Sequence, residues 1–220
     1  MIKNIFFDFD GVLAESVNVK TEAFRNLYRH AGDDIADKVV EYHLANGGVS
    51  RYDKIRYYHK EFLKLDISDD EVNEWAGRFS DLALDGVVNA PQVAGAVDFL
   101  SAYHKKYRCW IITGTPTGEI RPILRQRNWN GYFEDAYGSP EKKYHWTEYI
   151  INKENLKRSE TVFVGDAKAD QEAAERSGLV FILRRTEENA HLFADYNGFE
   201  INDMLDLPRV LTEIELVTDK

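Results

Sequence analysis

Four short, almost wholly apolar segments recur along the chain and limit the folds that it can adopt. They are "NIFFDF" (4–9), "CWIITG" (109–114), "TVFVGD" (161–166) and "LVFILR" (179–184). Such segments are typical of central strands in a parallel sheet that is covered on both faces. Helical patterns accompany them at residues 94–107, 118–129, 145–156 and 170–178. This alternation predicts an α/β fold built on a doubly wound, Rossmann-like parallel sheet.

The segment from about residue 17 to 88 interrupts this alternation. It contains helical patterns rich in Tyr, His and charge but no convincing strand, and it is followed by "GVVNAP" (86–91), which has the Gly and Pro of a linker. We therefore expect an all-helical cap domain over residues 16–89, inserted into a core domain formed by residues 1–15 and 90–220. Residues 198–216 indicate a last short strand and a closing helix.

Composition and charge narrow the classes of protein to which the chain can belong. The formal net charge of −10 argues against nucleic-acid binding, which needs a basic surface. No apolar stretch approaches the length of a membrane span, and "MIKNIFF" does not resemble a signal peptide. The single cysteine, Cys109, excludes an intrachain disulfide and suits a reducing compartment. We expect a cytoplasmic protein, without nucleic-acid or membrane partners, that is a monomer or a weak homo-oligomer.

Chemically active residue types follow the expected strands. They are Asp8 and Asp10, Thr113 with Gly114, a lysine of "GSPEKK" (138–143), and Asp166 with Asp170. Each alone has a structural interpretation, such as an Asp-Gly turn or a helix cap. Together, at the carboxyl edge of one parallel sheet, they would form a ligand site. Carboxylates gathered there would repel one another without a cation, and oxygen-only ligation suits Mg²⁺.

The motifs "DFDGV", "IITGT", "GSPEKK" and "GDAKAD", in this order over the whole chain, resemble those of the haloacid dehalogenase-like (HAD) hydrolase superfamily. A helical cap directly after the first motif is similar to the branch that contains β-phosphoglucomutase and phosphoglycolate phosphatase. The resemblance implies that Asp8 is the nucleophile and that Asp10 is the general acid and base. It also implies that Asp8, Asp166 and the backbone carbonyl of Asp10 bind Mg²⁺, with Asp170 orienting this metal site rather than binding the ion directly.

The same resemblance implies a phosphate-binding role for Thr113 and the amide of Gly114. It also implies a catalytic lysine, for which Lys142 and Lys143 are both candidates; Lys143 fits the pattern Gly-Ser-Pro-x-x-Lys. Lys20 stands where the sugar-phosphomutase members carry a histidine, which argues against mutase activity. Lys20 is either a surface charge or a ligand of an acidic substrate.

The predicted cap contains a candidate specificity loop in "NGGVSRYDK" (46–54). Ser50 is a plausible N-cap, with Asp53 three residues later. Arg51 is either solvated or paired with Asp53 or a neighbouring acid, or it reaches into the cleft; related capped HAD proteins favour contact with substrate. For Lys54 a surface role and a substrate-binding role are equally open.

The sequence therefore predicts a phosphatase that uses Mg²⁺ to hydrolyse a small phosphate monoester, such as a sugar phosphate, through an aspartyl-phosphate. A phosphomutase of the β-phosphoglucomutase type is the alternative. A third hypothesis is a non-catalytic protein that binds a phosphorylated metabolite. Asp10 argues against dehalogenase and phosphonoacetaldehyde hydrolase chemistry, because those family members lack an aspartate at this position.

Overall fold

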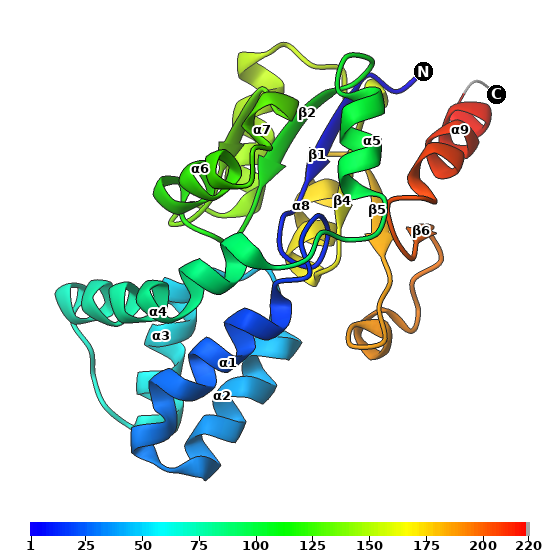
Figure 1. The fold of residues 1–220 in the computed structure, drawn as a ribbon. Coiled ribbons are helices and arrows are strands. Elements are labelled where there is room, and N and C mark those ends of the chain that lie inside the picture. The colour runs from blue at the N-terminus through cyan, green and yellow to red at the C-terminus, as the bar shows by residue number, and fades with distance from the viewer. Residues whose placement is uncertain (219–220) are drawn as a thin grey trace.

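The computed structural model describes residues 1–218 and is built around a six-stranded sheet in which every neighbouring pair is parallel (Figure 1). The strand order is β3-β2-β1-β4-β5-β6. The strands are β1 (Asn4–Phe7), β2 (Arg108–Ile112), β3 (Asp135–Tyr137), β4 (Thr161–Gly165), β5 (Val180–Arg184) and β6 (Phe199–Ile201). This arrangement confirms the expected doubly wound sheet. Strands β2 and β3 lie on one side of β1, and β4, β5 and β6 lie on the other. Such sheets bind ligands where the strand order changes direction, which here is between β1 and β4.

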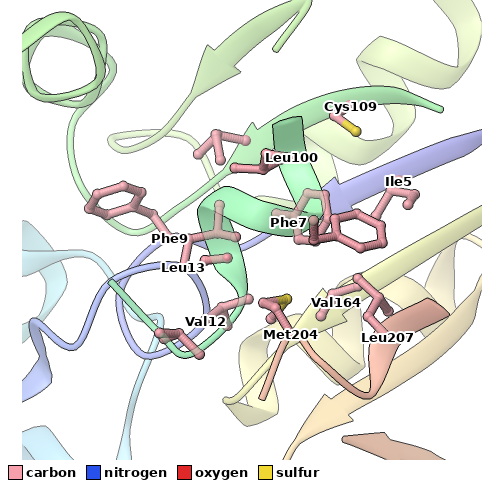
Figure 2. Close-up of a cluster of buried hydrophobic side chains, with 14 of the residues drawn as sticks. Ile5, Phe7, Phe9, Val12, Leu13, Leu100, Cys109, Val164, Met204 and Leu207 are labelled. Carbon is pink, nitrogen blue, oxygen red and sulfur yellow. The ribbon is translucent and has the colours of Figure 1, made fainter. Parts of the chain in front are cut away.

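Helices cover both faces of the sheet because successive strand residues point to opposite sides. The face of Phe7 packs against α5 (Ala96–Tyr103), α6 (Thr117–Gln126) and α9 (Leu207–Thr218). Figure 2 shows part of this cluster, in which Phe7, Leu100, Val164 and Leu207 are among the labelled side chains. The face of Phe6 packs against α7 (Lys143–Lys153) and α8 (Lys168–Arg176). Cys109 is buried in the first cluster, as its apolar neighbours predict.

Residues 17–89, all within the described chain, form helices and no strand. The helices are α1 (Val17–Tyr28), η1 (Arg29–Ala31), α2 (Asp33–Ala45), α3 (Arg51–Tyr57), the π-helix η2 (Tyr58–Leu63) and α4 (Asp69–Asn89). They share an apolar cluster of their own around Phe24, Tyr28, Tyr58 and Phe79. Figure 1 shows them as a group beside the sheet. This separate cluster supports our proposal of a cap domain over residues 16–89.

Two adjacent connectors join these helices to the rest of the chain. The amide of Glu15 donates to the carbonyl of Pro91 at 2.9 Å, and the amide of Val93 donates to the carbonyl of Leu13 at 2.9 Å. Arg127, which follows α6, donates through Nη1 to the carbonyls of Val87, Val88 and Ala90 at the end of α4, at 2.8–3.0 Å. These bonds satisfy helix-terminal carbonyls that would otherwise lack partners. None of the helices formed by residues 1–218 has the length and apolar character needed to cross a membrane.

Candidate active site

The sheet register brings the polar residues that follow β1, β2 and β4 to one edge. Phe7 pairs with Ile111 on one side and with Val164 on the other, so these strands end level with one another. Strand β1 ends at Phe7, and Asp8 and Asp10 lie in the loop beyond it rather than on the strand. Gly11 allows this loop to turn, because its φ is +74° and a Cβ there would lie 2.2 Å from Oδ2 of Asp166.

Lys143 lies between two carboxylates at this edge. Its Nζ is 2.8 Å from Oδ2 of Asp8 and 2.6 Å from Oδ1 of Asp170, and all three residues are buried. Lys143 is the first residue of α7, and this position directs it toward the sheet edge. Lys142 precedes the helix and is exposed. The structure therefore places Lys143 beside Asp8 and leaves Lys142 at the surface.

Asp8, Asp166 and Asp170 form a compact group of carboxylates. One oxygen of each lies within 4.8 Å of the others. Burial and then the charges of Asp8 and Asp170 raise the pKa of Asp166 well above its ordinary value. Burial also raises the pKa of Asp170 to about 7, although Lys143 opposes this shift. Burial alone would lower the pKa of Lys143, but Asp170 and Asp8 outweigh it and raise the value. An oxygen-only donor set with excess negative charge fits a hard divalent cation.

Asp10 has different partners from Asp8. Its carboxylate accepts hydrogen bonds from Ser16 Oγ at 2.6 Å and Thr115 Oγ1 at 3.0 Å, and it forms an ion pair with Lys20. Burial acts to raise the pKa of Asp10, but the charge of Lys20 and these hydrogen bonds outweigh it, so that the pKa lies below its ordinary value. The carboxylate is therefore ionised and fixed in orientation. Its side chain is not part of the group formed by Asp8, Asp166 and Asp170.

Thr113 and Gly114 lie where the helical insertion meets the sheet edge. Thr113 is buried and lines the same cavity as Asp8. The loop before α3 packs so closely on Gly114 that a Cβ there would lie 2.9 Å from the carbonyl oxygen of Gly48. A larger residue at position 114 would therefore push this loop away from the sheet edge.

A cavity of about 170 Å³ lies between the sheet edge and helices α1–α4. This volume is smaller than the roughly 300–1,000 Å³ of sites for drug-sized ligands, so it suits a small metabolite. The sheet side contributes Asp8, Asp10, Thr113, Gly114 and Asp166, and the helical side contributes Lys20, His43, Arg51 and Lys54.

Arg51 and Lys54, the two expected specificity residues, both line this cavity but differ in their partners. Arg51 forms a two-bond ion pair with Glu119 of α6, at 2.9 and 2.8 Å, and stacks over Phe79. Lys54 is 2% exposed, and its Nζ lies 2.9 Å from Nδ1 of His43. Burial, followed by the charges of Lys20 and Lys143, lowers the pKa of Lys54 to about 7. The expected N-cap is confirmed, because Ser50 accepts a hydrogen bond from the amide of Asp53.

Several residues around the cavity escaped the sequence reasoning. Ser16 and Thr115 hold Asp10, Glu119 holds Arg51, and His43 contacts Lys54. Thr115 could have been suggested by its place two residues after Thr113. The other three carry no local sequence signal, because their partners come from different elements.

Comparison with known proteins agrees with this geometry. The sequence model of the haloacid dehalogenase-like hydrolases matches residues 2–178, so the chain belongs to this family. A predicted phosphoglycolate phosphatase from Haemophilus somnus has a similar structure, with 19% identity, coverage of 96% of this chain and 98% of that chain, and a TM-score of 0.74. A β-phosphoglucomutase from Clostridium difficile has 16% identity, full coverage of both chains and a TM-score of 0.80. These two likenesses show a shared fold. No curated protein matches the sequence.

Proposed function

We propose that this hydrolase is an Mg²⁺-dependent phosphatase that cleaves a small phosphate monoester through an aspartyl-phosphate on Asp8. One observation carries the proposal: Asp8 is buried and lines the cavity, 2.8 Å from Lys143 Nζ, while Asp10 nearby has separate partners. Two carboxylates in different environments can take two different chemical roles. Membership of a hydrolase family supports the same reaction type.

In the first step an oxygen of Asp8 attacks phosphorus, and the bond from phosphorus to the ester oxygen breaks. Asp10 donates a proton to this leaving oxygen. The approach of a phosphate dianion raises the pKa of Asp10, which opposes the effect of Lys20 and favours the protonated form. In the second step Asp10 takes a proton from water as the water attacks the aspartyl-phosphate. Phosphate and an alcohol are released. As the phosphate leaves, Asp10 returns to the solvent the proton that it took from water, so both aspartates end ionised as they began.

The donor set at the sheet edge fits Mg²⁺, since it offers carboxylate oxygens and carries excess negative charge. Asp8, Asp166 and the backbone carbonyl of Asp10 would hold the ion, and Asp170 would orient the site through Lys143 and the amide of Ala167. When bound, the ion supplies positive charge that reduces the repulsion between Asp8 and the phosphate. Lys143, Thr113 and the amide of Gly114 bind the phosphate oxygens.

The first experiment measures phosphate release from a panel of phosphorylated metabolites and one aryl phosphate, with Mg²⁺ and with chelator. We expect metal-dependent release by the native protein and none by Asp8→Asn, whose circular dichroism spectrum should match that of the native protein. Exposed Asp66→Asn is the matched control and should retain activity. Turnover by a folded Asp8→Asn protein would refute the nucleophile assignment. Release that requires a sugar bisphosphate activator would indicate a phosphomutase instead.

A further inference from the structure

The cationic side chains that line the cavity differ in whether a carboxylate of this chain pairs with them. Within the described residues, four lysine or arginine side chains line it, and three of them are paired with a carboxylate: Lys20 with Asp10, Arg51 with Glu119, and Arg184 with Glu15. Lys54 is the exception. No carboxylate oxygen of residues 1–218 lies within 4.0 Å of its Nζ.

Lys54 instead contacts His43, with its Nζ 2.9 Å from Nδ1 and 3.4 Å from the carbonyl oxygen of that residue. Burial, and then the charges of Lys54 and Lys20, lower the pKa of His43 well below its ordinary value. A neutral imidazole whose Nδ1 accepts a bond from Lys54 keeps its own proton on Nε2. His43 also lines the cavity. The pair therefore offers two kinds of donor there, an ammonium group and an imidazole N–H.

A buried ammonium group without a counter-charge is unfavourable, and the pKa of Lys54, lowered to about 7, reflects this cost. The other cations that line the cavity have their carboxylate partners within this chain. The charge of Asp10 acts on Lys54 only from beyond ion-pair distance, so a molecule that enters the cavity can supply a direct counter-charge. An anionic group placed there would gain a charge-assisted hydrogen bond and would favour the charged form of Lys54.

The two sides of the cavity would contact opposite ends of a bound substrate. Asp8 and Thr113 belong to the sheet edge, whereas Lys54 lies on α3 and His43 on α2, in the helical insertion. A phosphate that faces Asp8 therefore directs the remainder of its molecule toward these helices. The small volume of the cavity keeps a short molecule within reach of both sides.

We infer that Lys54 and His43 form a binding subsite for a second oxyanion, a carboxylate or another phosphate, on the leaving-group side of the substrate. The substrate class is thus a doubly anionic small metabolite rather than the phosphate ester of a neutral alcohol. This inference rests on the proposed function, because it takes the reacting phosphate to lie at Asp8.

The test measures binding, so that it does not depend on turnover. Titration calorimetry on the Asp8→Asn protein with Mg²⁺ compares 3-phosphoglycerate with glycerol 3-phosphate, and fructose 1,6-bisphosphate with fructose 6-phosphate. We expect the extra anion to tighten binding at least about tenfold in one pair, as a hydrogen bond to a charged group does. The pair that responds distinguishes a carboxylate from a second phosphate. Adding Lys54→Met should remove the preference, whereas adding Lys54→Arg should retain most of it.

Lys60→Met is the matched control, because Lys60 is exposed on the helical turn that follows Lys54 and does not line the cavity. The Asp8→Asn/Lys60→Met protein should keep the full preference. Equal or undetectable binding within both pairs overturns the inference, as does a preference that survives Lys54→Met. If the native protein releases no phosphate but the Lys54-dependent preference is present, hydrolysis is refuted and the subsite stands.

Discussion

Asp8 and Asp10 are two residues apart, yet their side chains have different partners. Asp8 contacts Lys143, whereas Asp10 is held by Ser16, Lys20 and Thr115. We predict that Asp10→Asn slows hydrolysis of an alkyl phosphate by about 10²–10⁴-fold, since both proton transfers are lost. An aryl phosphate has a leaving group that needs little protonation. With it, rapid-quench kinetics should show a burst of released phenolate followed by slow turnover.

The burst distinguishes proton transfer from metal binding in this variant. If Asp10 serves only to bind Mg²⁺, excess Mg²⁺ should restore turnover of both esters, and no burst should appear. Asp10→Glu, which keeps the carboxylate, is the conservative comparison and should recover part of the alkyl phosphate activity. Equal rate losses in the burst and in steady turnover would contradict the proposed role.

At the residue scale, the sequence indicates which side chains gather at the sheet edge but not how each is held. Parallel strands end at a common edge, so Asp8, Thr113 and Asp166 could be grouped from their positions after apolar segments. The lysine was ambiguous because Lys142 and Lys143 are adjacent and only the start of α7 separates them. The contact of Lys20 with Asp10 depends on the direction of α1, which no local pattern defines.

At the scale of elements, the pair of Arg51 on α3 with Glu119 on α6 joins the helical insertion to the sheet layer. Both bonds are short, and Arg51 is almost fully buried. We predict that Arg51→Ala and Glu119→Ala destabilise the protein by similar amounts and that the double variant is little worse than either. Urea unfolding of the four proteins should give a coupling free energy of about 1–3 kcal/mol, typical of residues in one ion-pair network.

Arg78 and Glu74, an exposed ion pair one turn apart on α4, provide the control cycle. Their coupling should not exceed about 0.5 kcal/mol, since exposed helical pairs contribute little. Independent losses for Arg51→Ala and Glu119→Ala would contradict the joining role. The predicted contact of Arg51 with substrate has its own readout, because Arg51→Ala should then lose more kcat/KM on a metabolite than on an aryl phosphate.

The type of each helix or strand is easier to predict from the sequence than the contacts between these elements. The expected strands and the helical insertion followed from apolar periodicity, and both are present. Strand β3 was missed because Asp135–Tyr137 is too short and too polar to show a strand pattern. The pairing of Arg51 with Glu119 spans 68 positions and requires two helices from different layers to meet. The nearby Asp53 was the partner that local spacing suggested.

At the scale of the whole molecule, folding and proton binding are linked through Asp166 and Asp170, and the proposed metal site would add metal binding to this linkage. Both carboxyl groups have a pKa above the ordinary 3.8 in the folded protein, and that of Asp170 is raised to about 7. Between pH 3.8 and about pH 7, the folded protein therefore binds more protons at these groups than the unfolded protein does. Their contribution to stability is therefore fully present below pH 3.8 and is lost as the pH rises toward 7. Asp10, with its lowered pKa, titrates below this range.

In the proposed metal site, Mg²⁺ would supply the positive charge that these carboxyl groups otherwise obtain from protons, so its effect should grow as the protons leave. We predict that Mg²⁺ at 100 times its Kd raises the free energy of unfolding by about 2.7 kcal/mol at pH 7.5. The same concentration should give a smaller gain at pH 5.5, where protons compete. Urea unfolding with Mg²⁺ and with chelator, at both pH values, measures this difference. Asp166→Asn should abolish most of the gain, and an equal gain at both pH values would show that the ion does not replace protons at Asp166 and Asp170.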